Sequence, residues 1–305
     1  MHSTNVKICH IQLLPIMSGV QRSMLEFLKR LDQRTYDLSV VCKEEGDLTK
    51  ELTLLGIRFH LIPSLQREIN LWKDIQALWQ LHRLFKSEKF DLIHTHSSKT
   101  GVLGRIAGKI AGVKTIFHTM HGLPFHQFTG RVRTLIYIFI ERLAGKLTDQ
   151  VIFVNNEERT YALKNHILQV GQVRTIYNGV DLKRTDLFNN STQRQKFRNQ
   201  WDIPQNAFIV AFVGRLWEQK DPQTLSKVVA ACADLPIYFL IVGDGPYFNH
   251  FKTTFSGQSR VKLVGWMDDC FPMYPAIDVL LLPSLWEGLS VTLIEAMAFG
   301  KPLIA

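Results

Sequence analysis

The sequence predicts an α/β fold with two domains, each built on a doubly wound parallel β-sheet. Strand-like apolar runs alternate with helical patterns almost from end to end, which is typical of parallel sheets covered by helices. The chain has 305 residues, 46% of them hydrophobic, enough for two buried cores. The alternation stops only over residues 179–198, where polar residues dominate. We therefore predict a domain junction there and two domains, residues 1–178 and 179–305.

The elements of the first domain follow from short apolar runs with polar boundaries. Strands are expected at residues 6–11, 36–42, 57–62, 92–95, 114–119 and 150–154. Between them, apolar residues recur at helical spacing around residues 25–31, 71–85 and 102–111. This order of elements predicts a sheet with helices on its faces.

The second domain repeats the pattern after residue 207. Strands are expected at residues 208–213, 237–242, 261–264, 279–282 and 302–304. A helix follows each strand except the last. Because ligands of open parallel sheets bind outside the carboxyl ends of the strands, we expect the functional residues of both domains at strand ends.

Several classes of protein are excluded by composition. Apolar runs such as residues 135–140 and 279–283 are far shorter than the roughly 20 residues that span a bilayer. The first residues lack the continuous apolar segment of a signal peptide, and no cysteine pair has the spacing of a zinc or redox site. We expect a cytoplasmic protein with reduced cysteines.

Positive charge is concentrated in the first half of the chain. Residues 1–150 hold 21 Lys and Arg against 13 Asp and Glu, a net charge of +8, out of +9 for the whole chain. An anionic membrane, a phosphorylated substrate or nucleic acid could meet this charge, although no nucleic-acid-binding module is recognisable. Residues 127–147 mix basic and apolar side chains, which predicts an amphipathic segment on the inner face of the plasma membrane. The alternative is an ordinary helix with a basic outer face.

Two glutamates near the C-terminus indicate a ligand site. Glu287 lies in the loop after a buried strand, and Glu295 lies eight residues later in a helix that begins near Ser290. Amide groups at a helix start favour phosphate, and carboxylates accept hydrogen bonds from sugar hydroxyls. This layout suits a sugar nucleotide, although the spacing alone also fits two solvent-facing glutamates.

Two cations and two glycines follow other strand ends of this domain. Arg215 and Lys220 come just past one strand end, five residues apart, where two cations could meet an anionic ligand. Gly243 and Gly245 do not form a dinucleotide fingerprint, because no third glycine stands at the required offset. No Asp-x-Asp pair stands where a divalent ion would bridge the diphosphate, so we expect no metal and no cofactor.

Strand ends of the first domain carry the remaining candidates. His121 ends a strand, Gly19 opens the first helix, and Lys99 opens a helix where it could meet a phosphate group. His94, His96 and His118 are weaker candidates, with strand-end packing as the alternative.

Six segments resemble family 4 (group 1) glycosyltransferases, which have the GT-B fold. They are the stretches DLIHTH (91–96), TMHG (119–122), NGVD (178–181), GRL with the following Lys220 (214–220), VGDGP (242–246) and the E-x7-E region (287–295). They occur in the family's order over nearly the whole chain. The stretches HTHSSKTG and HTMHG most resemble bacterial enzymes that assemble capsule, exopolysaccharide or O-antigen on a lipid carrier.

The resemblance implies two Rossmann-like domains facing a cleft, the first binding the acceptor and the second the nucleotide sugar. Arg215 and Lys220 would grip the donor diphosphate, Glu287 the transferred sugar and Glu295 the ribose, while His121 would face the reacting sugar. The implied donor site is completed by Gly19, Gly243, Gly288, Leu289 and Ser290, and the implied acceptor site contains Lys99 and His121. The implied reaction is metal-independent, retaining transfer of a hexosyl or N-acetylhexosaminyl group, with UDP as the expected nucleotide, to a lipid-linked saccharide.

Two other functions remain open: a non-catalytic sugar-nucleotide-binding subunit, and a UDP-sugar epimerase of the same fold. Members of the family usually continue beyond the position of Ala305, into a segment that completes the second sheet. We therefore expect this form to be truncated, with an incomplete second domain, an unpaired sheet edge and little turnover.

Overall fold

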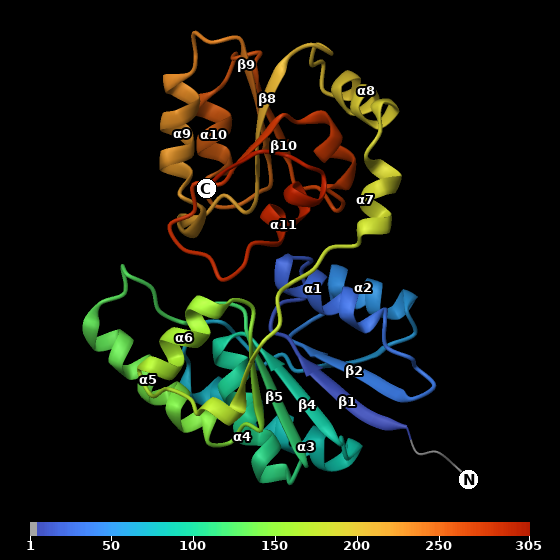
Figure 1. The fold of residues 1–305 in the computed structure, drawn as a ribbon. Helices are drawn as coiled ribbons and strands as arrows, with labels where there is room; N and C mark the ends of the chain where they lie inside the picture. The colour runs from blue at the N-terminus through green and yellow to red at the C-terminus, as the bar shows by residue number, and fades with distance from the viewer. Residues whose placement is uncertain (1–4) are drawn as a thin grey trace. The chain divides into compact units, whose positions relative to one another are not determined.

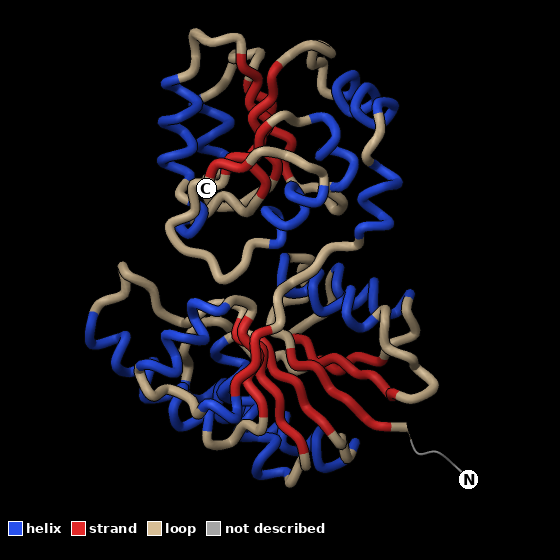
Figure 2. Tube along the Cα trace, in the orientation of Figure 1, coloured by secondary structure: helices blue, strands red, loops and turns tan. Residues whose placement is uncertain are grey.

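The computed structural model describes residues 5–305, which divide into two units between Tyr177 and Asn178. Each unit is a parallel β-sheet covered by helices (Figures 1 and 2). The α/β class predicted from the sequence is confirmed. No helix in this part of the chain is long and apolar enough to cross a bilayer.

The first unit contains a seven-stranded sheet in the order β3-β2-β1-β4-β5-β6-β7, and all its neighbouring strands are parallel. Its strands are β1 (Val6–Ile11), β2 (Tyr36–Cys42), β3 (Arg58–Leu61), β4 (Leu92–His96), β5 (Thr115–Met120), β6 (Gln150–Phe153) and β7 (Val173–Thr175). The strand order reverses between β1 and β4. Such a switch point is where doubly wound sheets bind their ligands.

Six α-helices accompany this sheet: α1 (Gly19–Leu28), α2 (Asp47–Leu54), α3 (Leu71–Glu88), α4 (Ser98–Ala111), α5 (Arg131–Gly145) and α6 (Asn156–Lys164). One apolar core joins α1 and α2 to β1 and β2, and another joins α3 and α4 to β1 and β4. Helix α3 shows how the sequence sets the boundaries, because the Asn70 side chain accepts a hydrogen bond from the Lys73 amide, and the helix ends where Lys89 adopts a φ of 56°.

The second unit contains a five-stranded parallel sheet in the order β10-β9-β8-β11-β12. Its strands are β8 (Phe208–Val213), β9 (Ile237–Val242), β10 (Val261–Gly265), β11 (Val279–Leu281) and β12 (Leu303–Ile304). The helices are α7 (Leu182–Phe188), α8 (Ser191–Gln200), α9 (Pro222–Ala231), α10 (Phe248–Thr254) and α11 (Val291–Ala298). The 3₁₀ helices η2 (Glu218–Lys220) and η3 (Phe271–Ala276) lie between them.

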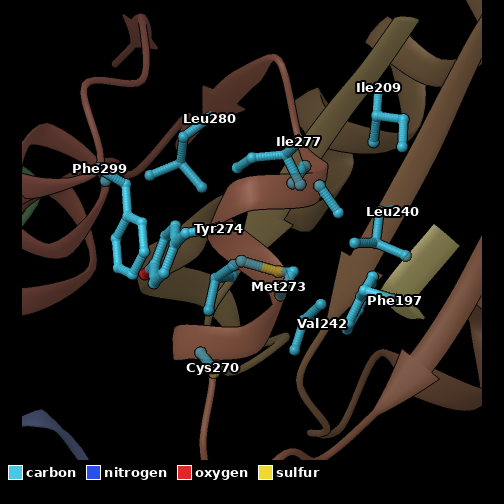
Figure 3. Close-up of a cluster of buried hydrophobic side chains, with 14 of the residues drawn as sticks. Phe197, Ile209, Leu240, Val242, Cys270, Met273, Tyr274, Ile277, Leu280 and Phe299 are labelled. Carbon is cyan, nitrogen blue, oxygen red and sulfur yellow. The ribbon is translucent and has the colours of Figure 1, made fainter. Parts of the chain in front are cut away.

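One apolar core of the second unit joins its sheet to α9 and α10, and another lies between the sheet and the segment η3 (Figure 3). Tyr274 is fully buried there, and its ring stacks on Phe299 with centroids 5.1 Å apart. Ile209, Leu240 and Leu280 close the core from the strands. This packing fixes the start of α11 against the sheet.

All eleven predicted strands are present, with ends that differ by no more than two residues. The sequence missed β7, because only Val173 of its three residues is buried. The two units meet within one residue of the predicted boundary, and the polar residues 179–198 lie at the start of the second unit. Those residues form α7 and α8, which belong to the second unit. Their polarity has a simple cause, since in α8 only Phe197 and Arg198 are buried.

Candidate functional site

Three loops meet at the carboxyl ends of β8, β9 and β11 in the second unit. The loop after β8 bonds to the loop after β9 through the Leu216 amide, which donates to the Asp244 carbonyl over 2.9 Å. It also bonds to the loop after β11, where the Leu285 amide donates to the Gln219 carbonyl over 2.8 Å. The Gln219 side chain adds a hydrogen bond of 2.9 Å to the Trp286 carbonyl. Backbone bonding therefore holds the three loops as one surface.

Gly243 and Gly245 make this close approach possible. A Cβ on Gly243 would lie 2.0 Å from the Gly214 carbonyl oxygen, and a Cβ on Gly245 would lie 2.5 Å from that of Leu216. Both glycines also have positive φ, 132° and 149°, which side-chain-bearing residues rarely adopt. Gly243 thus acts through the backbone, by letting the Arg215 loop pack against the end of β9.

Lys220 and Glu287 are brought into direct contact although they lie 67 residues apart. The Lys220 Nζ forms an ion pair with Glu287 Oε1, and the two side chains are 13% and 25% exposed. Arg215 is exposed on the same loop, with its guanidinium carbon 5.5 Å from the centre of the Trp217 ring. The structure therefore joins a cation expected at a diphosphate to a carboxylate expected at a sugar.

Glu295 lies in the second turn of α11 and is buried, with 8% of its surface exposed. The Tyr274 hydroxyl donates a 2.7 Å hydrogen bond to its Oε2 atom. Gly288, Leu289 and Ser290 form the loop that leads into α11, and the Asn178 side chain donates to the Leu289 carbonyl over 3.2 Å. The helix start and Glu295 are consequently held by neighbours within the same unit.

Histidines gather at the carboxyl ends of β1, β4 and β5 in the first unit. The Nδ1 atom of His10 lies 3.1 Å from Nε2 of His96, and Nδ1 of His96 lies 3.0 Å from Nε2 of His121. His94 pairs with His10 in the strand register, and its Nε2 lies 2.7 Å from the Thr119 hydroxyl. His121, His94 and His96, all noted in the sequence, are thus brought together, and His10 joins them.

Burial keeps this cluster uncharged. It lowers the pKa of His10 and that of His121 to about 4, and it holds the pKa values of His94 and His96 well below the ordinary 6.5. Neutral imidazoles are also metal ligands, and one ligand atom from each of His10, His94 and His96 lies within 4.8 Å of the others. In the structure, however, the nitrogens of His10 and His96 face each other at hydrogen-bonding distance, so hydrogen bonds already account for that contact.

Lys99 and Gly19 lie at the starts of α4 and α1. The Lys99 Nζ is 2.6 Å from Asp74 Oδ1 of α3, in a pair whose side chains are only 19% and 16% exposed. Gly19 is exposed, and the preceding Ser18 hydroxyl bonds to the Gln21 side chain. An acceptor phosphate at Lys99 would therefore have to compete with Asp74.

His118 has a structural environment. It is fully buried, its Nδ1 lies 2.9 Å from the Thr95 hydroxyl, and a Cβ on Gly101 would lie 2.6 Å from its ring. Its position matches the packing alternative given above.

The sequence did not predict three residues that contact the candidate residues, one among the histidines of the first unit and two in the second unit. His10 could have been found as a polar residue at the carboxyl end of a buried strand. Tyr274 and Gln219 carried no such signal, because their contacts with Glu295 and Trp286 are purely tertiary.

Two models of known glycosyltransferase families match the chain, one over its first part and one over its second. Residues 17–184 match the model of Glycosyltransferase Family 4, and residues 207–305 match that of Glycosyl transferases group 1. The chain is a family 4 glycosyltransferase. Its resemblance to the family, stated from six motifs, is confirmed.

Curated relatives of this glycosyltransferase include enzymes of surface polysaccharide assembly. It is 37% identical over 310 residues to the UDP-Gal:alpha-D-GlcNAc-diphosphoundecaprenol alpha-1,3-galactosyltransferase of Escherichia coli, covering 99% of this chain and 79% of that protein. It is 22% identical to the capsular polysaccharide biosynthesis glycosyltransferase CapM of Staphylococcus aureus, covering 98% of this chain and 78% of that protein.

Solved structures with the same fold include Anabaena HepE in complex with UDP and glucose. That structure aligns with a TM-score of 0.81 at 20% identity, over 99% of this chain and 80% of the other. WaaG, a glycosyltransferase involved in lipopolysaccharide biosynthesis, aligns with a TM-score of 0.76 at 16% identity, over 97% of this chain and 80% of the other. These likenesses confirm the GT-B fold.

Proposed function

We propose that this glycosyltransferase moves a hexosyl group, galactose first among the candidates, from its UDP derivative to a lipid-linked saccharide in surface polysaccharide synthesis. The observation that carries the proposal is the surface of three bonded loops that holds Arg215, Lys220 and Glu287 at strand ends. The choice of galactose and of an undecaprenyl diphosphate carrier rests on the activity of the Escherichia coli relative.

At the donor site, Arg215 and Lys220 would bind the diphosphate, and Glu287 would bind hydroxyls of the transferred sugar. Glu287 already contacts Lys220, so it holds the ammonium group in place before the donor arrives. Fixed cations stabilise the departing diphosphate more strongly than the intact donor, and this difference lowers the barrier. Glu295, oriented by Tyr274, would accept hydrogen bonds from the ribose.

We propose retention of anomeric configuration by attack on the face from which the diphosphate departs. The bond between the anomeric carbon and the diphosphate oxygen breaks, the acceptor oxygen bonds to that carbon, and its proton passes to the departing phosphate. The cations Arg215 and Lys220 supply the positive charge in this scheme, so turnover should not need a divalent metal. His121 would bind a sugar hydroxyl as a neutral group, because burial lowers its pKa to about 4.

Helix α5 supports attachment to an anionic membrane surface. Its outer face carries apolar residues every three or four positions that are 47–72% exposed: Val132, Leu135, Ile136, Phe139 and Leu143. Arg131, Arg133 and Lys146 are exposed on the same helix or directly after it. An exposed apolar stripe beside basic residues is typical of a helix that lies in a membrane interface, and it favours attachment over the alternative of an ordinary helix with a basic outer face.

Vesicle binding tests the membrane part of the proposal. Replacing Arg131, Arg133 and Lys146 by Gln should weaken binding to phosphatidylglycerol vesicles by roughly 1 kcal/mol per residue. Arg142 stays unchanged, because it donates to the carbonyls of His166 and Asn165. The matched control removes three exposed lysines of the second unit: Lys183, Lys196 and Lys227. Equal loss of binding in both triple variants would contradict a membrane role for α5.

One assay separates the proposed function from its two rivals. The protein is incubated with labelled UDP-galactose and undecaprenyl-diphosphate-linked N-acetylglucosamine, and UDP binding is measured in parallel. We expect label in the lipid fraction. Conversion of UDP-galactose to another UDP-sugar without acceptor would identify an epimerase, and UDP binding without either product would identify a non-catalytic subunit.

A further inference from the structure

Three histidines of the first unit form a row of hydrogen bonds that ends at His121. His10 Nδ1 faces His96 Nε2 at 3.1 Å, and His96 Nδ1 faces His121 Nε2 at 3.0 Å. The rings of His10 and His96 are nearly parallel at 17°, and those of His96 and His121 at 27°. Each ring therefore uses a nitrogen to bind the next, and His96 uses both.

The number of protons restricts the row to two arrangements. Burial keeps all three rings neutral at pH 7, so each carries one N–H. Each of the two contacts needs one N–H and one bare nitrogen. If His96 carries its proton on Nδ1, it donates to Nε2 of His121, so the proton of His121 lies on Nδ1. His10 then donates from Nδ1 to His96, and its own Nε2 is bare. If His96 carries its proton on Nε2, the last proton lies on His10 Nε2, and His121 Nδ1 is bare.

The buried end of the row distinguishes the two arrangements. His10 is 1% exposed, and its Nε2 has no hydrogen-bond partner among residues 5–305. A proton on this atom would be a buried donor without an acceptor, and orphaned buried donors are rarer than unpaired acceptors. A bare Nε2 avoids that state. The last proton then belongs at the other end of the row, on His121, which is only partly buried.

We propose that His10 and His96 are positioning residues that hold His121 as its Nδ1–H tautomer, so that His121 donates a hydrogen bond from Nδ1 to a sugar hydroxyl. The hydroxyl as the acceptor rests on the proposed function, whereas the tautomer does not. In this arrangement His96 accepts from His10 at Nε2 and donates from Nδ1 to His121. The side chain of His10 therefore affects His121 through His96, although His10 would not contact the substrate.

Nuclear magnetic resonance of the unliganded protein labelled with ¹⁵N tests the tautomer without any activity. Long-range proton–nitrogen correlations distinguish a protonated ring nitrogen from a bare one, and the His121 signals are assigned by their loss in His121→Gln. We expect His121 to carry its proton on Nδ1 and His10 to have a bare Nε2. A proton on Nε2 of His121 in the unaltered protein would overturn the proposal, even if no variant folds.

Two variants of His96 test the positioning role. His96→Leu removes the bond to His121, whereas the amide of His96→Asn can occupy the place of Nδ1 and donate to His121 Nε2. We expect His96→Leu to mix the His121 tautomers and to lower turnover by about tenfold, the effect of losing one neutral hydrogen bond. His96→Asn should restore the Nδ1–H signal and most of the turnover. In a protein that transfers sugar, equal turnover of the two variants would overturn the positioning role. A correct tautomer in a protein that transfers no sugar would refute only the proposed function.

Discussion

Replacing Gly243 by Ala should uncouple the loops that hold Arg215. The new Cβ would lie 2.0 Å from the Gly214 carbonyl oxygen and 2.8 Å from the Gly214 carbonyl carbon. Both are backbone atoms, so no flexible side chain can move away. We expect the loop that contains Arg215 to be displaced from the end of β9.

The magnitude has two parts. A side chain at a φ of 132° costs about 1–3 kcal/mol, and forcing the backbone apart in a packed region costs about 1–3 kcal/mol more. Together they lower the free energy of unfolding of the second unit by about 2–6 kcal/mol, a large share of the 5–15 kcal/mol that stabilises an ordinary domain.

Hydrogen exchange of the β8 and β9 amides in increasing denaturant measures this loss for the second unit alone. Gly257→Ala is the matched control, because Gly257 also has a positive φ, 79°, but nothing lies within 4 Å of its added Cβ. That variant should lose only about 1–2 kcal/mol. Equal losses in the two variants would refute the close approach of the loops. Unchanged UDP affinity in a destabilised Gly243→Ala would contradict the assignment of this surface as the donor site.

Three further predictions concern stability, nucleotide binding and metal dependence. Because burial lowers the pKa of His10 and of His121 to about 4, the unfolded chain binds more protons than the folded one between pH 6.5 and 4. The free energy of unfolding should therefore decrease as the pH is lowered through that window, by up to about 1.4 kcal/mol per pH unit for each histidine. Denaturant unfolding at pH 7 and pH 5 measures this decrease, which should be smaller in His10→Asn, and an equal decrease in that variant would contradict the prediction. Tyr274→Phe keeps the stack on Phe299 but removes the hydrogen-bond donor to Glu295, so KM for a UDP-sugar should rise about tenfold or more with little change in kcat. If Glu295 binds the 2′-hydroxyl of the ribose, a 2′-deoxyuridine donor should show a smaller rise, and equal effects on both donors would exclude that contact. Excess chelator should leave turnover unchanged, and strict dependence on added Mg²⁺ or Mn²⁺ would refute metal independence.

The fold could be predicted because most strands are continuous apolar runs. In β8, for example, Ile209, Ala211, Phe212 and Val213 are all buried. Strand β7 could not be predicted, since it has three residues and joins the sheet only through β6. The same limit applies to α8, whose polar sequence conceals a buried Arg198 that donates to several backbone carbonyls, including that of Ala276.

The residues of the candidate site that directly follow strand ends could be predicted from the sequence. Arg215, Lys220 and Glu287 all follow such ends, and their motifs carried the family resemblance. The pairs that orient these groups were not predictable, because they depend on packing between distant segments. Asp74 reaches Lys99 only because α3 packs on α4. Tyr274 reaches Glu295 only because η3 and α11 share one apolar core.

Transfer of labelled sugar by Lys220→Ala tests the central claim most directly. If Lys220 stabilises the departing diphosphate, this variant should transfer sugar to the lipid-linked acceptor roughly 10²-fold more slowly than the unaltered protein. Lys227→Ala removes the same charge from an exposed position of α9 and should transfer at the normal rate. Turnover of Lys220→Ala close to that of Lys227→Ala would contradict the assignment of this surface as the donor site.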